Sequence, residues 1–406
     1  MKQIASFFFA MTVFLSPSFA DCSGNRYAAE IFSDVNVTTD IEYGYNPNSE
    51  TTLRLDFYEG MGDTETNRPL IIMIHGGTFI TGSKSAADMV YMCENFAKRG
   101  YAAASINYSL GISGISETDL FVAVVKAVHD AKAAIRFFRK EAAENANPFG
   151  INPDKIFIGG YSAGAITAVQ VAYLKDDSSP ISSNLQTALD NQGGTLEGES
   201  GNAGYSSSVA GVFNISGGIH KLDWMEVGDV PIVSVHGDSD NTVPYGFGDV
   251  GVGGINLTTL HGGFDINEHA PTLDIRSALY TYGGGGHEAP IIADSLNTTF
   301  TFGADFLYDE VCVGTSVENF IHSSTSNITV YPNPSNGTFN LNFINTQESK
   351  TYELSLYNLE GRLLENKQIN ATDNTKLDFS NYNNGLYLLQ LTDADGSTIT
   401  KKLQIQ

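Results

Sequence analysis

The chain has 406 residues, of which 42% are hydrophobic, so it is long enough for two or three domains with buried cores. Its 22 lysine and arginine residues stand against 46 aspartate and glutamate residues, which gives a formal net charge of −24 at pH 7. A surface this acidic repels phosphate backbones and anionic lipid headgroups, which argues against nucleic acid and charged membrane surfaces as partners.

The first twenty residues have the pattern of a secretory signal peptide. Lys2 supplies the positive charge, residues 4–15 form an apolar stretch, and residues 18–20 (Ser-Phe-Ala) resemble a cleavage site. The apolar stretch is too short to span a bilayer comfortably, and no later segment reaches transmembrane length. We therefore expect a mature chain that begins at Asp21, is secreted or held at the cell surface, and has no transmembrane segment.

Three cysteines follow this signal: Cys22, Cys93 and Cys312. An oxidising compartment allows one disulfide and leaves one thiol over. Cys93 lies in a predicted helix, where a buried thiol behaves as a small apolar group, so we favour a bond between Cys22 and Cys312. There is no CxxC motif or Cys/His cluster, and we expect neither a metal nor another cofactor.

Between residues 21 and 315, short apolar runs alternate with helical patterns. The predicted strands cover residues 70–74, 101–106, 155–158, 209–215, 231–235 and 277–282. The predicted helices cover residues 87–99, 116–145, with Ser116 as the N-cap, and 163–174. Strands that are apolar on both faces and are separated by helices predict an α/β fold with a doubly wound, mostly parallel sheet.

Two polar segments interrupt this alternation. Residues 176–208 are rich in Asp, Ser, Asn and Gly, and we interpret them as a long insertion over the carboxyl edge of the sheet. Residues 246–264 are glycine-rich and are interpreted as a second loop. Loops of this kind usually shape access to the substrate.

After Cys312 the composition changes again. Residues 316–326 are polar and are typical of a linker. From Asn327 onward, apolar residues alternate with polar ones and turn residues separate the runs, which predicts a small β-sandwich over residues 327–406.

The strongest chemical signal is the motif G-x-S-x-G at residues 160–164, between a predicted strand and a predicted helix. Side chains in place of Gly160 and Gly164 would collide with the neighbouring strand and helix. The turn forces Ser162 into a strained conformation with its hydroxyl at the edge of the sheet, and the following helix favours negative charge there. This context predicts that Ser162 is a nucleophile.

A serine nucleophile needs a base to take its proton and an acid to orient that base. In this fold the acid and then the histidine follow the serine along the chain. Asp240 is our choice for the acid, with Asp238 as the competitor. His287, after four glycines and the last predicted strand, is the choice for the base; other histidines, such as His236, come too early.

An oxyanion-binding loop is expected at residues 75–79, His-Gly-Gly-Thr-Phe, directly after the strand over residues 70–74. Small residues let backbone N–H groups face a substrate carbonyl, and each such donor commonly lowers the barrier by about 3 kcal/mol. The N–H of Ala163, directly after the nucleophile, is a further expected donor. His75 itself is interpreted as an anchor for the loop rather than as a base.

Taken together, HGGTF, GYSAG, HGDSDNTVPY and GGGGH resemble the carboxylesterase and lipase branch of the α/β-hydrolases over residues 45–310. The resemblance implies that Gly77 and Thr78 donate the other two oxyanion N–H groups. Thr78 departs from the usual HGGGF; a backbone donor survives the change, but the branched side chain narrows the acyl side. The implied activity is hydrolysis of carboxylic esters, including short acyl, feruloyl or acetyl, and polyester-type esters.

The tail resembles the sorting domain of the type IX secretion pathway. The residues that carry this resemblance are YPNP at 331–334 with Gly337, LYNLEG at 356–361, GLYLL at 385–389 and the pair Lys401-Lys402. It implies export across the outer membrane, with the secretion machinery as a partner. The alternative is a carbohydrate-binding β-sandwich, but the sequence shows no stripe of exposed aromatic residues that would support it.

Two other functions compete with the esterase prediction. A serine peptidase of the same fold usually carries a propeller-like gating domain when it is extracellular, and the sequence has none. A non-catalytic binding protein on a hydrolase scaffold typically lacks a triad member, whereas Ser162, Asp240 and His287 are all present.

Overall fold

The computed structural model describes residues 22–175, 181–313, 327–331, 333, 335–344, 351–358, 362–370, 375–393 and 398–405. The predicted signal peptide and the linker over residues 316–326 lie outside this part. The chain divides into two compact units, residues 1–314 and 315–406. Among the described residues, no helix combines the length and the apolar character that crossing a membrane requires.

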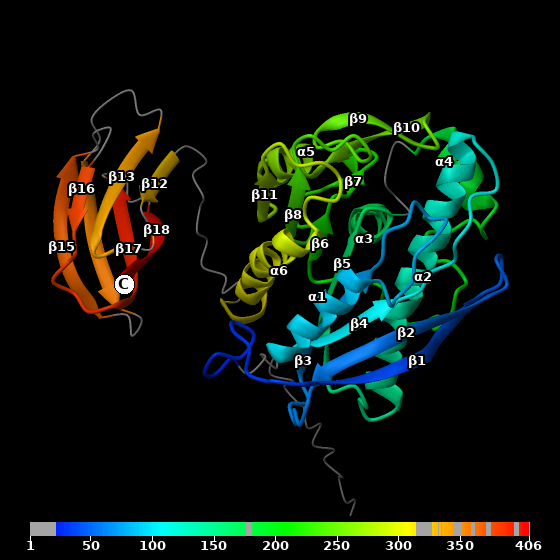
Figure 1. Ribbon diagram of the computed structural model, residues 1–406, viewed down its shortest axis with the longest axis horizontal. Coiled ribbons are helices and arrows are strands. Elements are labelled where there is room, and N and C mark those ends of the chain that lie inside the picture. The colour runs from blue at the N-terminus through cyan, green and yellow to red at the C-terminus, as the bar shows by residue number, and fades with distance from the viewer. Residues whose placement is uncertain are drawn as a thin grey trace, which may run out of the picture. The chain divides into compact units, whose positions relative to one another are not determined.

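The first unit is built around an eight-stranded sheet with the order β1-β2-β4-β3-β5-β6-β8-β11 (Figure 1). Pairs from β4 to β11 are parallel, whereas β2 runs antiparallel to both of its neighbours. The expected mostly parallel sheet is confirmed. The strands are β1 (Val35–Asn46), β2 (Thr51–Gly60), β3 (Arg68–Ile74), β4 (Ala102–Ile106), β5 (Ile151–Tyr161), β6 (Val212–Ile215), β8 (Ile232–Gly237) and β11 (Ser277–Tyr282).

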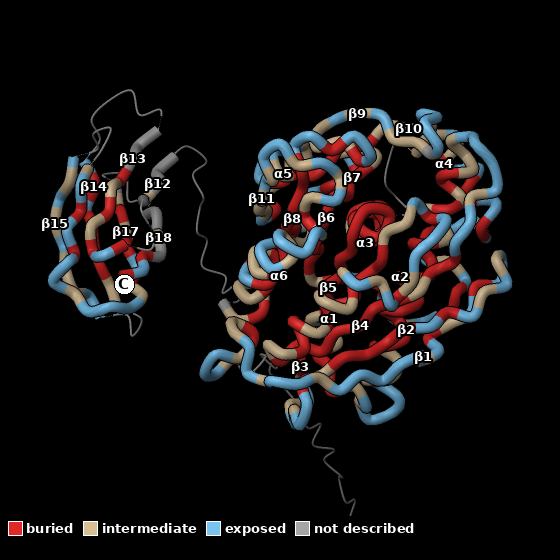
Figure 2. The backbone as a smooth tube through the Cα atoms, viewed as in Figure 1, coloured by how far each residue is buried: buried red, intermediate tan, exposed pale blue. Residues whose placement is uncertain are grey.

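Helices cover both faces of this sheet and bury its central strands (Figure 2). One apolar core lies between the sheet and α2, α3 and α4, and the other between the sheet and α1 and α6. Every residue of β3 is buried, which explains its continuous apolar run. The helices are α1 (Ala87–Lys98), α2 (Glu117–Glu144), α3 (Ala163–Tyr173), α4 (Ser183–Asp190), α5 (Gly263–His269) and α6 (Ala293–Tyr308). Shorter helical turns are Leu222–Trp224, Ala270–Leu273 and Asp309–Val313.

The N-terminus of α2 is capped as its sequence predicts. The Ser116 hydroxyl accepts the N–H of Asp119, and the Asp119 carboxylate accepts the N–H of Ser116, which completes a capping box.

The described part of the insertion, residues 181–208, starts near the carboxyl edge of the sheet, as expected, and then runs along α2, which corrects the expectation for the rest of the segment. Asn184 bonds Glu117, the first residue of α2, and Tyr205 bonds Glu144, the last. Between them, Glu197 forms ion pairs with Lys132 and Arg136. Polar residues are abundant in this segment because they bind the polar side of a long helix. The short helix α4 was missed because only Leu185, Ala188 and Leu189 of its eight residues are buried.

The glycine-rich segment over residues 246–264 is not a loop but a β-hairpin, which is a second correction. Strands β9 (Phe247–Val252) and β10 (Ile255–Gly262) pair with each other, and β10 also pairs with β7 (Gly218–Ile219). Gly253 and Gly254 form the turn with φ of +62° and +82°. Paired glycines with positive φ are typical of a tight hairpin turn, a signal that the glycine content of the strands obscured.

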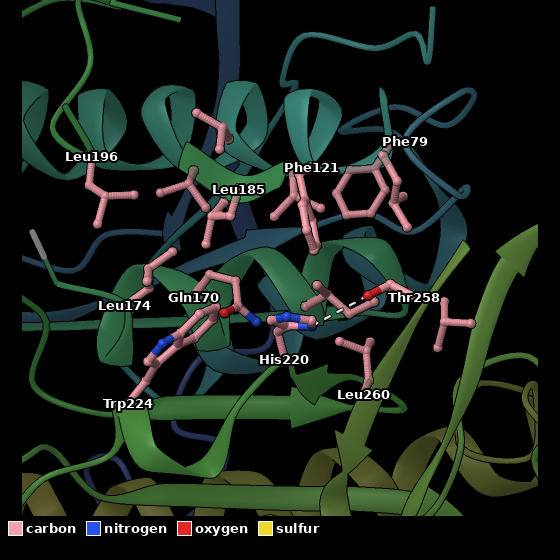
Figure 3. Close-up of a pocket in the computed structure, with 16 residues that line it drawn as sticks. Phe79, Phe121, Gln170, Leu174, Leu185, Leu196, His220, Trp224, Thr258 and Leu260 are labelled. Carbon is pink, nitrogen blue, oxygen red and sulfur yellow. Dashed lines mark hydrogen bonds between the residues drawn. The ribbon is translucent and has the colours of Figure 1, made fainter. Parts of the chain in front are cut away.

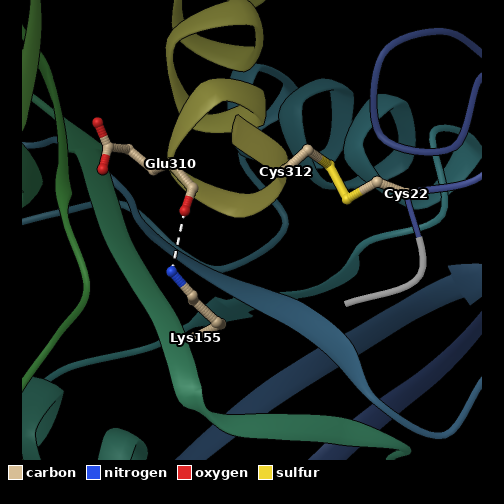
Figure 4. The surroundings of a disulfide bond; sticks show 4 residues. All are labelled: Cys22, Lys155, Glu310 and Cys312. Atoms are coloured by element: carbon tan, nitrogen blue, oxygen red, sulfur yellow. Dashed lines mark hydrogen bonds between the residues drawn. A yellow bond between two sulfur atoms is a disulfide. The ribbon is translucent and has the colours of Figure 1, made fainter. Parts of the chain in front are cut away.

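A disulfide joins Cys22 to Cys312 near the two ends of the first unit, whereas Cys93 is a buried free thiol (Figure 4). The expected pairing is therefore confirmed. Beside it, Lys155 donates to the backbone carbonyl of Glu310 at 2.9 Å.

The double substitution Cys22→Ser with Cys312→Ser is expected to lower the free energy of unfolding. The bond closes a loop with a sequence separation of 290 residues, so chain entropy alone gives an upper estimate of about 6 kcal/mol. Urea denaturation monitored by fluorescence measures the loss. A reducing agent should lower the urea midpoint of the unsubstituted protein and leave that of the double variant unchanged. Equal midpoints for the two proteins without reducing agent would show that the disulfide does not stabilise the fold.

The second unit contains two antiparallel sheets, β12-β13-β16 and β15-β14-β17-β18, which share one apolar core. This arrangement confirms the predicted β-sandwich. Its strands are β12 (Asn327–Tyr331), β13 (Thr338–Ile344), β14 (Thr351–Asn358), β15 (Leu363–Asn370), β16 (Thr375–Asp378), β17 (Gly385–Asp393) and β18 (Thr398–Ile405).

Candidate active site

Strand register brings the predicted site residues to one edge of the large sheet. Ile74 at the end of β3 pairs with Gly160 in β5, so residues 75–79 and Ser162 leave the sheet side by side. Tyr282 at the end of β11 pairs with Gly237 at the end of β8. The segments that carry His287 and Asp240 therefore also begin next to each other. Carboxyl ends of parallel strands are where ligands bind in open α/β sheets.

Ser162 occupies the sharp turn that its motif predicts. It has φ of 54° and ψ of −120°, outside the regions that non-glycine residues prefer. A Cβ atom on Gly160 would lie 2.5 Å from the carbonyl oxygen of Ile74, and one on Gly164 would collide with the same oxygen. Glycines at both positions let β3, β5 and α3 approach closely enough to hold this strained serine.

The structure brings Ser162, His287 and Asp240 together in one hydrogen-bonded chain. The Ser162 Oγ lies 2.8 Å from His287 Nε2, and His287 Nδ1 lies 2.7 Å from Asp240 Oδ2. The Asp240 side chain is fully buried, whereas that of His287 is 15% exposed. This is the order of nucleophile, base and orienting acid that acyl transfer requires.

The surroundings of Asp240 keep its carboxyl ionised. Burial opposes ionisation, but hydrogen bonds from His236 and His287 outweigh it and hold the pKa of the Asp240 carboxyl well below its ordinary value. The other oxygen, Oδ1, accepts the N–H groups of Thr242 and Val243 at 2.8 and 3.0 Å. A carboxylate with four donors can orient a histidine and stabilise its positive charge.

Asp238, the competing acid, lies in the same turn but binds the histidine loop. Its Oδ1 accepts the N–H of Gly284 at 2.7 Å. That loop is tightly turned, because Gly285 N–H donates to the Tyr282 carbonyl and Gly284 has φ of +70°. Asp238 therefore holds the glycine turn from which His287 extends, while Asp240 contacts the imidazole.

The expected oxyanion loop is anchored by His75. Its Nδ1 lies 2.7 Å from the Gly76 carbonyl, its ring stacks on Tyr108 at 4.5 Å, and the Tyr108 hydroxyl donates to the His75 carbonyl. Burial lowers the pKa of the His75 imidazole. Gly77 and Thr78 follow with φ of +117° and +56°, and Ala163 is the first residue of α3.

Replacing Thr78 with glycine is expected to stabilise the protein by about 1 kcal/mol, because a β-branched residue at positive φ is strained. The side chain is exposed, so its removal leaves no cavity. The backbone N–H remains, and ester turnover should stay within about threefold. Ile80→Gly is the matched control: Ile80 lies in the same loop, is 44% exposed and lacks positive φ, so glycine should destabilise there. Urea denaturation compares the two variants; equal losses of stability would show that Thr78 is unstrained.

Two hollows adjoin these residues. An open groove of about 460 Å³ runs between the oxyanion loop and the β9–β10 hairpin, with Thr78, Asn241 and Asn256 among its lining residues. A narrower apolar pocket of about 40 Å³ lies between α2, α3 and the hairpin (Figure 3). Its lining includes Phe79 from the oxyanion loop and Ile166 from the first turn of α3, the two segments that flank the serine.

His236 was dismissed as a site residue on sequence grounds, yet it contacts the acid. Its Nε2 lies 3.2 Å from Asp240 Oδ2. Chain order excluded it as the base, and the four-residue spacing to Asp240 spans a tight turn that no periodic pattern reveals. In the sequence, only the closeness of His236 and Asp240 within HGDSD (residues 236–240) indicates that the two residues could meet.

Comparisons with known proteins agree with this division of the chain. Residues 55–220 match the BD-FAE family model, and residues 329–406 match the model of a secretion system C-terminal sorting domain. Gut esterase 1 of Caenorhabditis briggsae is 33% identical over 108 residues, which are 26% of this chain and 18% of that protein. Carboxylesterase 1C of Rattus norvegicus is 31% identical over 139 residues, which are 34% of this chain and 23% of that protein. The chain thus spans about a fifth of the length of these relatives.

A solved structure extends the likeness over most of the first unit. Esterase 2 of Thermogutta terrifontis, phosphorylated by paraoxon, superposes with a TM-score of 0.50 at 22% identity and covers 68% of this chain and 95% of that one. At this identity the likeness shows the fold, which is that of the α/β-hydrolases.

Proposed function

We propose that this protein is a secreted serine carboxylic ester hydrolase. The chain joins an α/β-hydrolase domain to a secretion sorting domain. The observation that carries the proposal is the hydrogen-bonded chain from Ser162 through His287 to the buried carboxylate of Asp240. The esterase names of several relatives support the same reaction class.

In the proposed mechanism, Ser162 Oγ attacks the ester carbonyl carbon while His287 Nε2 takes the hydroxyl proton. The backbone N–H groups of Gly77, Thr78 and Ala163 stabilise the negative oxygen of the tetrahedral intermediate. His287 then gives the proton to the leaving alcohol, and an acyl-enzyme remains on Ser162. Water, activated by the same imidazole, attacks the acyl carbon and releases the acid.

The hollows at the site favour a short acyl group. The apolar pocket is narrow, with about 40 Å³ of free volume between mostly apolar side chains, and is proposed to take the acyl group. The wider groove, whose lining includes several threonine and asparagine side chains, is proposed to take the alcohol part. Short acyl esters, acetyl esters included, are proposed for the narrow pocket, whereas feruloyl and polyester-type esters are proposed to place their larger groups in the wider groove.

The experiment is hydrolysis of p-nitrophenyl acetate, butyrate and octanoate by the purified protein. We expect kcat/KM to fall from butyrate to octanoate by roughly tenfold or more, because the longer chain must enter a narrow pocket whose apolar side chains leave little free volume. Turnover that rises with chain length would contradict the short-acyl proposal. A folded protein with no turnover on any ester would favour a peptidase or a binding protein on the same scaffold.

We further propose that residues 1–20 and the C-terminal domain act in export. The domain arrangement proposed is a signal peptide over residues 1–20, a catalytic domain over 21–315, a linker over 316–326 and a type IX sorting domain over 327–406. The match of residues 329–406 to a sorting domain and the division of the chain after Gly314 support it. Deleting residues 327–406 should retain the protein inside a producing cell with this secretion system, and immunoblots of cell and medium fractions measure the difference.

A further inference from the structure

A second imidazole lies buried against the carboxylate of the proposed catalytic acid. His236 is on β8, and the side chains of His236 and Asp240 are both 0% exposed. The turn that follows β8 brings Asp240 back over the ring, with Asp240 N–H donating to the carbonyl of Gly237. His236 Nε2 then lies 3.2 Å from Asp240 Oδ2 and 3.1 Å from the Val243 carbonyl.

The partners of His236 determine which nitrogen carries its proton. Both atoms near Nε2 are acceptors, whereas Nδ1 accepts the backbone N–H of Gly263 at 3.3 Å. A neutral imidazole donates from one nitrogen and accepts at the other, so the contacts assign the proton to Nε2. The tautomer is therefore fixed by acceptors in the turn after β8, on the Nε2 side, and by the N–H donor of the first residue of α5, on the Nδ1 side.

The oxygen that His236 binds is the same one that orients His287. Asp240 Oδ2 accepts from His287 Nδ1 at 2.7 Å and from His236 Nε2 at 3.2 Å. A second donor to a carboxylate oxygen favours its charged form and lowers its basicity toward the first donor. It also limits rotation of the carboxylate, which keeps Oδ2 directed at His287.

The two tyrosines near these imidazoles make hydrogen bonds that involve neither imidazole ring. The ring of Tyr245 meets His236 edge-on at 5.8 Å, and its hydroxyl is 2.6 Å from Thr281 Oγ1. The ring of Tyr161 lies 5.1 Å from that of His287, and its hydroxyl donates to the His287 backbone carbonyl. Glu288 follows His287 directly along the chain. A change at His236 therefore acts on His287 through Asp240.

We propose that His236 is a positioning residue of the triad, which sets both the direction and the basicity of the Asp240 oxygen that His287 uses. The inference rests on the proposed hydrolase function. His236 touches neither substrate nor the reacting atoms; it acts through the carboxylate.

Two substitutions separate this role from simple packing. His236→Leu removes the donor, whereas His236→Gln keeps an N–H donor of similar reach. In the leucine variant we expect kcat for p-nitrophenyl butyrate to fall roughly tenfold, with little change in KM. The glutamine variant should stay within about threefold of the unsubstituted protein.

The pH profile of kcat/KM is the more specific measurement. Its acid limb reports the imidazole that must be neutral to take the serine proton. Without the second donor, Oδ2 holds the protonated imidazole more strongly, so the neutral form appears at higher pH. The limb should move upward by roughly half a pH unit in His236→Leu and remain in place in His236→Gln. Two folded variants with the same limb position, or with the same loss of kcat, would overturn the proposal.

A spectroscopic measurement needs neither a variant nor activity. Two-dimensional ¹H–¹⁵N spectra of the unsubstituted protein, labelled with ¹⁵N-histidine, report the tautomer of each ring. The ring of His236 is expected to carry its proton on Nε2. An Nδ1–H tautomer of His236 would overturn the proposal even if the leucine variant failed to fold. Failure of the hydrolase proposal would appear separately, as absent ester turnover in the unsubstituted protein.

Discussion

Ser162→Ala is expected to lower kcat for p-nitrophenyl acetate roughly a million-fold, to the residual rate that the oxyanion donors and binding provide. The hydroxyl is the only part of the residue that the reaction uses. Within the described residues it makes no capping bond to α3, and its bond is to His287 Nε2. Alanine tolerates the backbone at φ of 54° about as well as serine, so the fold should be retained.

Initial rates and urea denaturation of the same preparation test this expectation. Ser239→Ala is the matched control, because Ser239 is exposed and its hydroxyl donates to the carboxylate of Asp238 in the same turn. That variant should retain turnover within about threefold. A folded Ser162→Ala protein with more than a few per cent of normal turnover would place the nucleophile elsewhere.

Asp240→Asn is expected to lower kcat roughly ten-thousand-fold. All four bonds to this carboxylate come from N–H donors, so an amide NH₂ group in its place faces donors instead of acceptors. The imidazole of His287 then loses its orienting acceptor and the partner of its positive charge. The loss should appear in kcat more than in KM, because the change affects the chemical step.

Asp238→Asn provides the comparison that decides between the two candidate acids. Asp238 is exposed and accepts the Gly284 N–H, a bond that an amide oxygen can also accept. Its substitution should cost less than about tenfold in kcat. A larger loss for Asp238→Asn than for Asp240→Asn, with both variants folded, would reverse the assignment.

The parallel sheet and the position of the serine could be predicted because their signals are local. β3 is buried on both faces, so its residues 70–74 form an uninterrupted apolar run. The start of α2 is predictable because Ser116 and Asp119 together form its N-terminal cap. The sharp turn at Ser162 requires glycine at positions 160 and 164, so it is visible in the sequence as a short motif.

Features that depend on distant partners could not be predicted. The polar segment after α3 gains its place from ion pairs of Glu197 with Lys132 and Arg136 on α2, sixty or so residues earlier. The hairpin of β9 and β10 has too many glycines for ordinary strand propensity, and pairing with β7 stabilises it. The contact of His236 with Asp240 depends on how one turn folds back, which spacing alone does not specify.

The most direct test of the central claim, that Ser162 is the acylated nucleophile, is covalent trapping followed by peptide mass spectrometry. The purified protein is incubated with paraoxon, an electrophilic phosphate ester that transfers its phosphoryl group to an activated serine with release of p-nitrophenolate. We predict one phosphoryl group per chain, located on Ser162, together with loss of ester turnover and absence of the adduct in Ser162→Ala. A folded, active protein that is modified at another residue, or that stays active without an adduct, would contradict the account.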